Sequence, residues 1–211
     1  AGAALSVNTL TAFGAQCIGG NYGPNSFNVS GVNLSTANIT IGAASGYAYS
    51  TSSTGPFTST LSITQPGGVF SQEIYVQFSP TAATSYSGNI AVGGGGASSQ
   101  NVAVSGSGIA AGAATVNTPT SASITTTSAI LGATIASTNC SDVTERGIEW
   151  STTTGFANGT GTQVNETGIF GTGDFTISVT GLQANTTYYW KAYATNSTGT
   201  TYTAQQTFVT T

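Results

Sequence analysis

Apolar and polar residues alternate in short stretches along the whole chain, which is the pattern of half-buried β-strands. No stretch sustains the i, i+3, i+4 apolar spacing of an amphipathic helix, and turn clusters such as 66–68 and 93–96 separate the stretches. The sequence therefore predicts an all-β fold. In the first half the expected strands are 26–32, 38–41, 60–63, 70–78, 89–92 and 101–104.

Alternation also assigns each side chain of an expected strand to one of two faces. Within 70–78, the core-facing set is Phe70, Gln72, Ile74, Val76 and Phe78, and the outward set is Ser71, Glu73, Tyr75 and Gln77. In the second half the core-facing sets are Ala129, Leu131, Ala133 and Ile135, then Ile148 and Trp150, then Phe175, Ile177 and Val179, and finally Tyr188, Trp190, Ala192 and Ala194.

The chain length favours two domains, because a β-sandwich of about 100 residues is a common unit and the chain has 211. Small residues without alternation dominate 105–108 and 110–114. We therefore expect two tandem β-sandwich domains, at 1–108 and 115–211, joined by a linker at 109–114.

Charged residues make up only 4% of the chain, against about 25% in typical soluble domains. Glu73 is the only one in the first expected domain, and the net charge is −4. Phosphate binding needs clustered Lys and Arg, so nucleic acid is excluded as a partner. No apolar run is long enough to span a membrane. The small residues Ala1 to Ala4 suit the mature side of a signal-peptidase site, so we expect an exported protein, extracellular or at the cell surface.

The chain has two cysteines, Cys17 and Cys140, which form the candidate disulfide. The alternative is two unrelated thiols. A zinc site is not expected, because the chain has no His and no Cys-x-x-Cys pair.

No catalytic, cofactor or metal site is expected, and we predict that the chain is not an enzyme. Without His, a Ser or Thr nucleophile lacks its usual base, and Lys191 is expected on the outward face of a strand. Glu145 and Glu149 share a strand face about 13 Å apart at ~3.3 Å per residue, too far for paired glycosidase carboxylates. We expect them to be solvated beside Arg146. No acidic loop of the calcium-binding kind is present.

Two further sets of residues are candidates for surface chemistry. Tyrosines expected on outward faces could stack on sugars or brace cross-strand pairs: Tyr47, Tyr49, Tyr75, Tyr189, Tyr193 and Tyr202. Asn-x-Ser/Thr sequons mark candidate glycosylation sites, if the producing cell has the machinery: Asn28, Asn33, Asn38, Asn139, Asn158, Asn165, Asn185 and Asn196.

The segment 181–196 resembles the E–F corner and F strand of a fibronectin type III domain. Leu182 and Tyr188 match its tyrosine corner, which implies that the Tyr188 hydroxyl bonds to upstream backbone. The segment 143–151 resembles the C strand of bacterial secreted versions of this domain. The family's core Trp on the B strand is missing here, and Trp150 and Trp190 are expected to fill that volume.

The segment 5–108 resembles the Ig-like repeats of bacterial secreted surface proteins, related in pattern to the Hydin-type family. The resemblance implies two tandem Ig-like β-sandwich domains, in modules that usually serve as spacers or adhesive units. The residues that carry it are Val76, Phe78, Pro80, Tyr86, Gly88, Ile90, Val104, Gly106 and Gly108.

Three functions remain open: a self-assembling subunit of an extracellular fibre, an adhesin or glycan-binding module, and a spacer from a larger secreted enzyme. A neutral surface favours the first, because it can be buried without desolvating ions. The loops 93–96 and 154–161 look too flexible for a preorganised glycan site. For a fibre, the expected partner is a second copy, head to tail. The apolar segment 5–13 either completes its own sandwich or is donated to a neighbour, and the disulfide could join successive subunits.

Overall fold

The computed structural model describes residues 2–211, so Ala1, the first of the small residues noted above, lies outside the described residues. These residues form eighteen β-strands and no helix, which confirms the all-β prediction. Their contacts divide the chain into two compact units, with the boundary between Ala110 and Ala111. No helix of the described residues is long and apolar enough to cross a membrane.

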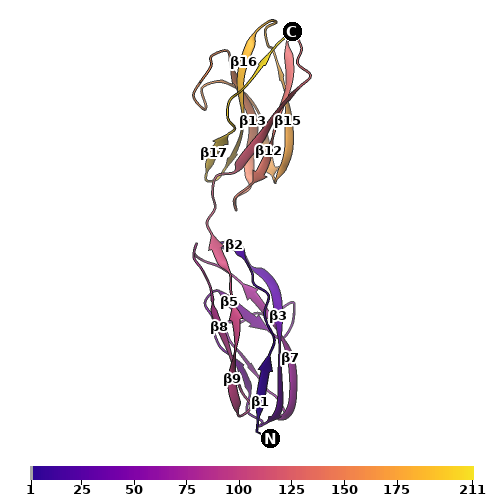
Figure 1. Cartoon of the computed structure of the whole chain (residues 1–211), viewed down its shortest axis with the longest axis vertical. Helices are drawn as coiled ribbons and strands as arrows, with labels where there is room; N and C mark the ends of the chain where they lie inside the picture. The colour runs from indigo at the N-terminus through magenta and orange to yellow at the C-terminus, as the bar shows by residue number, and fades with distance from the viewer. Residues whose placement is uncertain (1) are drawn as a thin grey trace. The chain divides into compact units, whose positions relative to one another are not determined.

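The first unit is a sandwich of two four-stranded sheets, whose strands are labelled in part in Figure 1. One sheet has the order β1 (Ala4–Val7), β3 (Tyr22–Leu34), β7 (Gly68–Phe78) and β5 (Tyr47–Ser50). The other has the order β6 (Leu61–Ile63), β4 (Ile39–Ile41), β8 (Gly88–Gly94) and β9 (Ala97–Val104). A separate parallel pair joins β2 (Ala15–Cys17) to β10 (Ser107–Ile109).

The core of the first unit follows the predicted alternation of β7. Ile74, Val76 and Phe78 are fully buried, and the residues between them are not. The strand β5 was not expected, and its Tyr47 and Tyr49 are buried rather than outward. Alternation separates two faces of a strand but does not say which one is covered. Here Tyr47 stacks on Phe78 with ring centroids 4.9 Å apart, so aromatic packing holds Tyr47 inside.

The N-terminal segment completes its own sandwich. β1 pairs antiparallel with β3, and both Leu5 and Phe13 are buried in the core of the first unit. In this structure the segment therefore pairs within its own domain. At the other end of the unit, two residues of the predicted linker have structural roles: Ile109 ends β10, and Ala114 is buried in the core of the second unit.

The second unit is a sandwich of a three-stranded and a five-stranded sheet (Figure 1). The first has the order β11 (Thr115–Ala122), β12 (Ser128–Ser137) and β15 (Gly173–Thr180). The second has the order β14 (Thr162–Phe170), β13 (Val143–Ser151), β16 (Thr187–Asn196) and β17 (Gly199–Tyr202), and β18 (Gln206–Val209) also pairs with β16.

The chain is thus two tandem Ig-like β-sandwich domains, because two antiparallel sheets face each other across one core in each unit. Trp190, which is 1% exposed, fills the centre of the second core, as expected from the missing B-strand Trp, and Trp150 is partly buried against the same core. Two polar atoms in the cores, Trp190 Nε1 and Tyr49 Oη, make no hydrogen bond of ordinary geometry to the described residues. The backbone of Ala44 lies close enough to Tyr49 Oη to lower its pKa, against the larger effect of burial.

The buried tyrosines of β5 predict a loss of stability at alkaline pH. Burial raises the pKa of Tyr47 and of Tyr49 to about 12, above about 10 in an unfolded chain. Since the folded pKa is the higher one, the contribution of each hydroxyl is complete below pH ~10 and is lost between pH ~10 and ~12. The free energy of unfolding should fall over this window by at most about 2–3 kcal/mol for each tyrosine, which is the full value of a two-unit difference in pKa before solvent screening.

Urea unfolding of the whole chain at a series of alkaline pH values measures this loss. The Tyr47→Phe variant removes one titrating group, so its free energy of unfolding should fall less steeply with pH than that of the parent. Equal slopes for the two proteins would contradict the assignment.

Candidate functional site

The predicted tyrosine corner is present in the second unit. Tyr188 lies near the start of β16, and its hydroxyl oxygen accepts a hydrogen bond from the backbone N–H of Gln183 at 3.0 Å. Leu182 is buried, and its N–H donates to the carbonyl of Thr127 at 3.0 Å. The ring of Tyr188 stacks on Phe208. The hydroxyl thus bonds to upstream backbone and pins the crossover between the sheets, with the oxygen as acceptor.

A comparable corner occurs in the first unit. The hydroxyl oxygen of Tyr86 accepts hydrogen bonds from the backbone N–H groups of Thr81 at 3.0 Å and Ala82 at 2.9 Å. The sequence spacing of the Tyr86 to Thr81 bond is five, the same as in Tyr188 to Gln183. The sequence pattern includes Tyr86 only among the residues that resemble a family. A tyrosine five residues after a turn, as at Tyr188, is the signal that indicates a corner at Tyr86.

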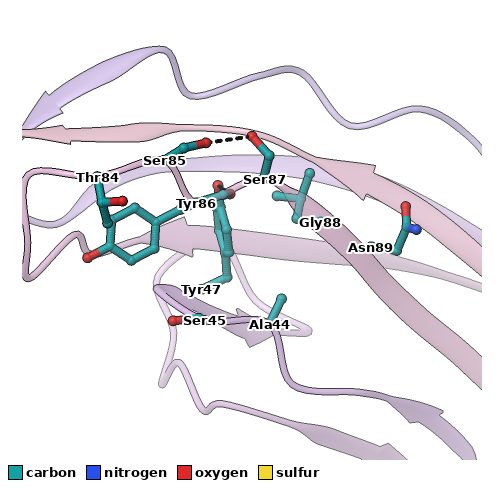
Figure 2. Close-up of a pocket in the computed structure, with 10 residues that line it drawn as sticks. Ala44, Ser45, Tyr47, Thr84, Ser85, Tyr86, Ser87, Gly88 and Asn89 are labelled. Carbon is teal, nitrogen blue, oxygen red and sulfur yellow. Dashed lines mark hydrogen bonds between the residues drawn. The ribbon is translucent and has the colours of Figure 1, made fainter.

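A cavity of about 360 Å³ lies beside Tyr86. Figure 2 shows Tyr86 and Tyr47 on its wall, with a hydrogen bond between the hydroxyls of Ser85 and Ser87, 3.0 Å apart. The Tyr47 hydroxyl donates to the carbonyl of Tyr86 at 2.8 Å. The lining contains only neutral side chains, so this cavity has no acid, base or nucleophile pair.

The main departure from the sequence analysis is a buried polar cluster on the outer face of the β13–β16 ladder. Glu149 and Lys191 are cross-strand partners, and alternation places both opposite the core residues Ile148 and Trp190. Glu149 was expected to be solvated, yet it is 0% exposed, and Lys191 is 9% exposed. The loop 152–161, between β13 and β14, covers them, with Phe156 also buried.

Each member of the cluster is bonded to this loop. The two carboxylate oxygens of Glu149 accept the backbone N–H groups of Gly159 at 3.0 Å and Gly161 at 2.6 Å. Lys191 Nζ donates to the carbonyl of Phe156 at 2.7 Å and to Asn158 Oδ1 at 2.8 Å, and it lies 4.4 Å from the centroid of the Phe156 ring.

This network corrects the expectation that the loop 154–161 is flexible. A side chain at Gly161 has no room, because a Cβ there would lie 2.8 Å from Glu149 Cγ. The charged groups therefore anchor a loop that the sequence alone suggested was mobile. The contacts of Lys191 Nζ are to carbonyl and amide oxygens, whereas a Ser–Lys dyad needs a serine hydroxyl.

The remaining charges of the second unit form separate pairs. Arg146 donates to Glu166 at 2.8 Å and lies 4.1 Å from the ring centroid of Phe170. The buried hydroxyl of Tyr193 donates to Glu145 at 2.9 Å, and burial, followed by this bond, raises the pKa of Tyr193. Within residues 2–211, no three acidic or cysteine side chains gather as a metal site would need.

The cysteines and sequons divide by burial and bonding. Cys17 and Cys140 are both disulfide-bonded, so the alternative of two thiols is wrong.

Asn196 is buried, and its amide donates to the carbonyls of Gly112 and Thr138, which leaves no room for a sugar. The half-buried Asn139 donates to Ala113 at 2.6 Å. Asn28 is half-buried, and the exposed sequons are Asn33, Asn38, Asn158, Asn165 and Asn185.

The tyrosines named for sugar stacking divide in the same way. Tyr47, Tyr49 and Tyr193 are buried, so the expectation that they face solvent is wrong. Tyr75, Tyr189 and Tyr202 are half-buried and keep part of their rings at the surface.

No protein-family model and no curated protein match the chain. Among solved structures, it is similar to the FN1-FN3 domains of chicken CNTN1, at 12% identity and a TM-score of 0.36, over 97% of this chain and 63% of that one. It is similar to a segment of titin at 13% identity and a TM-score of 0.37, over 98% of this chain and 66% of that one. It is also similar to a two-domain fibronectin type III segment of chicken tenascin, at 14% identity and a TM-score of 0.33, over 90% of this chain and 95% of that one. The scores are low, and the fold assignment above rests on strand order.

The tyrosine corner predicts a measurable contribution to stability. Tyr188→Phe keeps the ring stack but leaves the N–H of Gln183 without its acceptor, so it should lower the free energy of unfolding by about 1–3 kcal/mol. Tyr189→Phe is the matched control, because its half-buried hydroxyl lies on the neighbouring residue outside the corner. Denaturant midpoints measure both, and an unchanged midpoint for Tyr188→Phe would refute the corner.

The polar cluster predicts a larger effect. Glu149→Ala removes the acceptor of two loop N–H groups, so it should cost about 2–4 kcal/mol and speed hydrogen exchange at Gly159 and Gly161. Glu166→Ala is the control, since its ion pair with Arg146 is partly exposed and should cost less than about 1 kcal/mol. Equal costs for the two variants would show that Glu149 does not anchor the loop.

Proposed function

We propose that this chain is a non-enzymatic extracellular structural module that assembles with copies of itself into a fibre. The observation that carries the proposal is the open edge strand β14. It pairs with β13 on one side only, and its other side has no partner strand in this chain. Most of its residues are exposed, including the apolar Ile169, which is 82% exposed. An edge strand of this length is a template for pairing with another chain.

Two other edges of the molecule are blunted, whereas β14 is not. β11 contains Pro119 and an irregular register between Asn117 and Thr120, features that blunt an edge. The outer edge of β5 is partly closed by the bridge between Tyr49 and Thr58. β14 has no Pro or Lys, and its one charge, Glu166, is neutralised by Arg146.

The composition of the surface supports the same function. A face of Ser, Thr, Asn and Gly can be buried against a neighbour without desolvating ions, which costs several kcal/mol for each charge. The first unit contributes only Glu73, whose carboxylate already accepts hydrogen bonds from Ser26 and Tyr75. Self-contact through such surfaces carries a low electrostatic penalty.

The disulfide supports secretion, because disulfides persist in oxidising compartments. A bacterial surface origin, and a relation of the first unit to Hydin-type repeats, remain part of this proposal and rest on the sequence resemblance. A head-to-tail arrangement of copies belongs to the proposal because a contact between two different surfaces can extend into an open filament, whereas a two-fold contact closes into a dimer.

An adhesin or glycan-binding module is the second candidate. The partly exposed rings of Tyr75, Tyr189 and Tyr202 favour it, since aromatic faces can stack on sugars. The anchored loop 152–161 also removes the objection that this loop is too mobile to preorganise a site. A spacer from a larger secreted protein would show neither self-assembly nor sugar binding.

A charge placed on β14 tests whether this strand mediates the proposed self-assembly. Thr167→Lys puts a Lys on an exposed position of this strand, opposite Glu145 on β13, so the domain should stay folded. Self-association should weaken at least about tenfold, as expected for a Lys on a pairing edge. Light scattering and electron microscopy of the secreted protein measure it.

Ser53→Lys is the matched control, because it adds the same charge in an exposed turn of the first unit and should leave assembly unchanged. A parent protein that remains a monodisperse monomer at high concentration would refute the fibre, and a positive glycan array would then favour the adhesin.

A further inference from the structure

We propose that Lys191 and Asn158 join in an intramolecular isopeptide bond. Lys191 is the only lysine of the chain, and it lies on β16 in the middle of the five-stranded sheet of the second unit. Its Nζ is 2.8 Å from Asn158 Oδ1. A primary amine held against a carboxamide, under a covering loop, is the reactant pair for transamidation.

The contact distance brings the reacting atoms close. A C=O bond is about 1.2 Å long, so Nζ lies at most about 4 Å from the Asn158 carbonyl carbon, Cγ. A near-attack arrangement needs about 3–3.5 Å, which a small change in the Asn158 side-chain torsions supplies. The carbonyl of Phe156, 2.7 Å from Nζ, holds the amine in this position.

The surroundings fix both partners. Glu149 accepts the N–H of Gly159, the residue after Asn158, and therefore acts as a positioning residue for the asparagine. The ring of Phe156, 4.4 Å from Nζ, shields the amine from water on one side. Lys191 itself is 9% exposed. The asparagine side chain is more open, which provides a path for the leaving ammonia.

The reaction balances without an oxidant or co-reactant. After the ammonium group releases one proton to solvent, the Nζ lone pair attacks Cγ and forms the Nζ–Cγ bond. The Cγ–Nδ2 bond then breaks, and Nδ2 leaves as ammonia with one proton from Nζ. The products are a secondary amide between Lys191 and Asn158 and one molecule of ammonia.

Such a bond would fasten the loop 152–161 covalently to the central strand of the second unit. It would add to the hydrogen bonds of Glu149, which hold the same loop. The proposal does not depend on fibre formation, because both reactants lie in one chain.

Intact-mass spectrometry of the secreted protein with its disulfide reduced tests the proposal. The expected mass is that of the sequence less one ammonia, and a non-tryptic digest should yield one cross-linked peptide that contains both Lys191 and Asn158. A mass equal to that of the sequence, or one increased by hydrolysis of Asn158 to aspartate, would overturn the bond.

Two variants separate the cross-link from a cyclic imide, which also loses ammonia. Lys191→Arg keeps a cation beside Phe156 but is not a nucleophile, so it should retain the full mass. Asn185→Ala alters another exposed loop asparagine and should keep the loss of ammonia. If a folded Lys191→Arg variant still lacks the mass of one ammonia, and the parent yields no cross-linked peptide, the proposal is refuted.

Discussion

The pairing of β13 with β16 is the constraint on which the second domain depends. One ladder sets two faces at once: Ile148 and Trp190 point into the core, while Glu149 and Lys191 point away from it. The outer pair could not remain under a loop unless its polar atoms were satisfied, because a buried ion without partners is costly. The backbone of 156–161 and the side chain of Asn158 supply those partners, so the ladder also determines how the loop folds.

The two domains contain the same local hydrogen-bonded corner. In each, a tyrosine hydroxyl accepts a backbone N–H five residues upstream and closes a connection, through Tyr86 in the first and Tyr188 in the second. They differ in electrostatics. The first domain carries a single charge, whereas the second has a partly exposed ion pair and a buried charged cluster. A first domain with a single charge and an open β14 edge in the second domain are the features that favour self-assembly.

Much of the fold was accessible to sequence reasoning, because period-two alternation reports directly on strands. The core faces of β7, β12 and β15 are as expected, and β13 coincides with the segment that resembles a C strand. Several strands were not among those expected from the sequence, β5 and β14 among them. β5 is only four residues long, and β14 is a polar edge with little apolar alternation, so neither produces a clear period.

The amino-acid sequence by itself determined the all-β class, the two-domain division of the pattern, the corner at Tyr188 and the scarcity of charge. These depend on residue type and short-range spacing. Tertiary structure alone decided that Tyr49 faces a core, that Asn196 is sealed by backbone carbonyls, and that Glu149 and Lys191 lie beneath a loop. The reason is physical: spacing assigns a side chain to a face of a strand, but only the path of a distant segment decides whether that face meets water or protein.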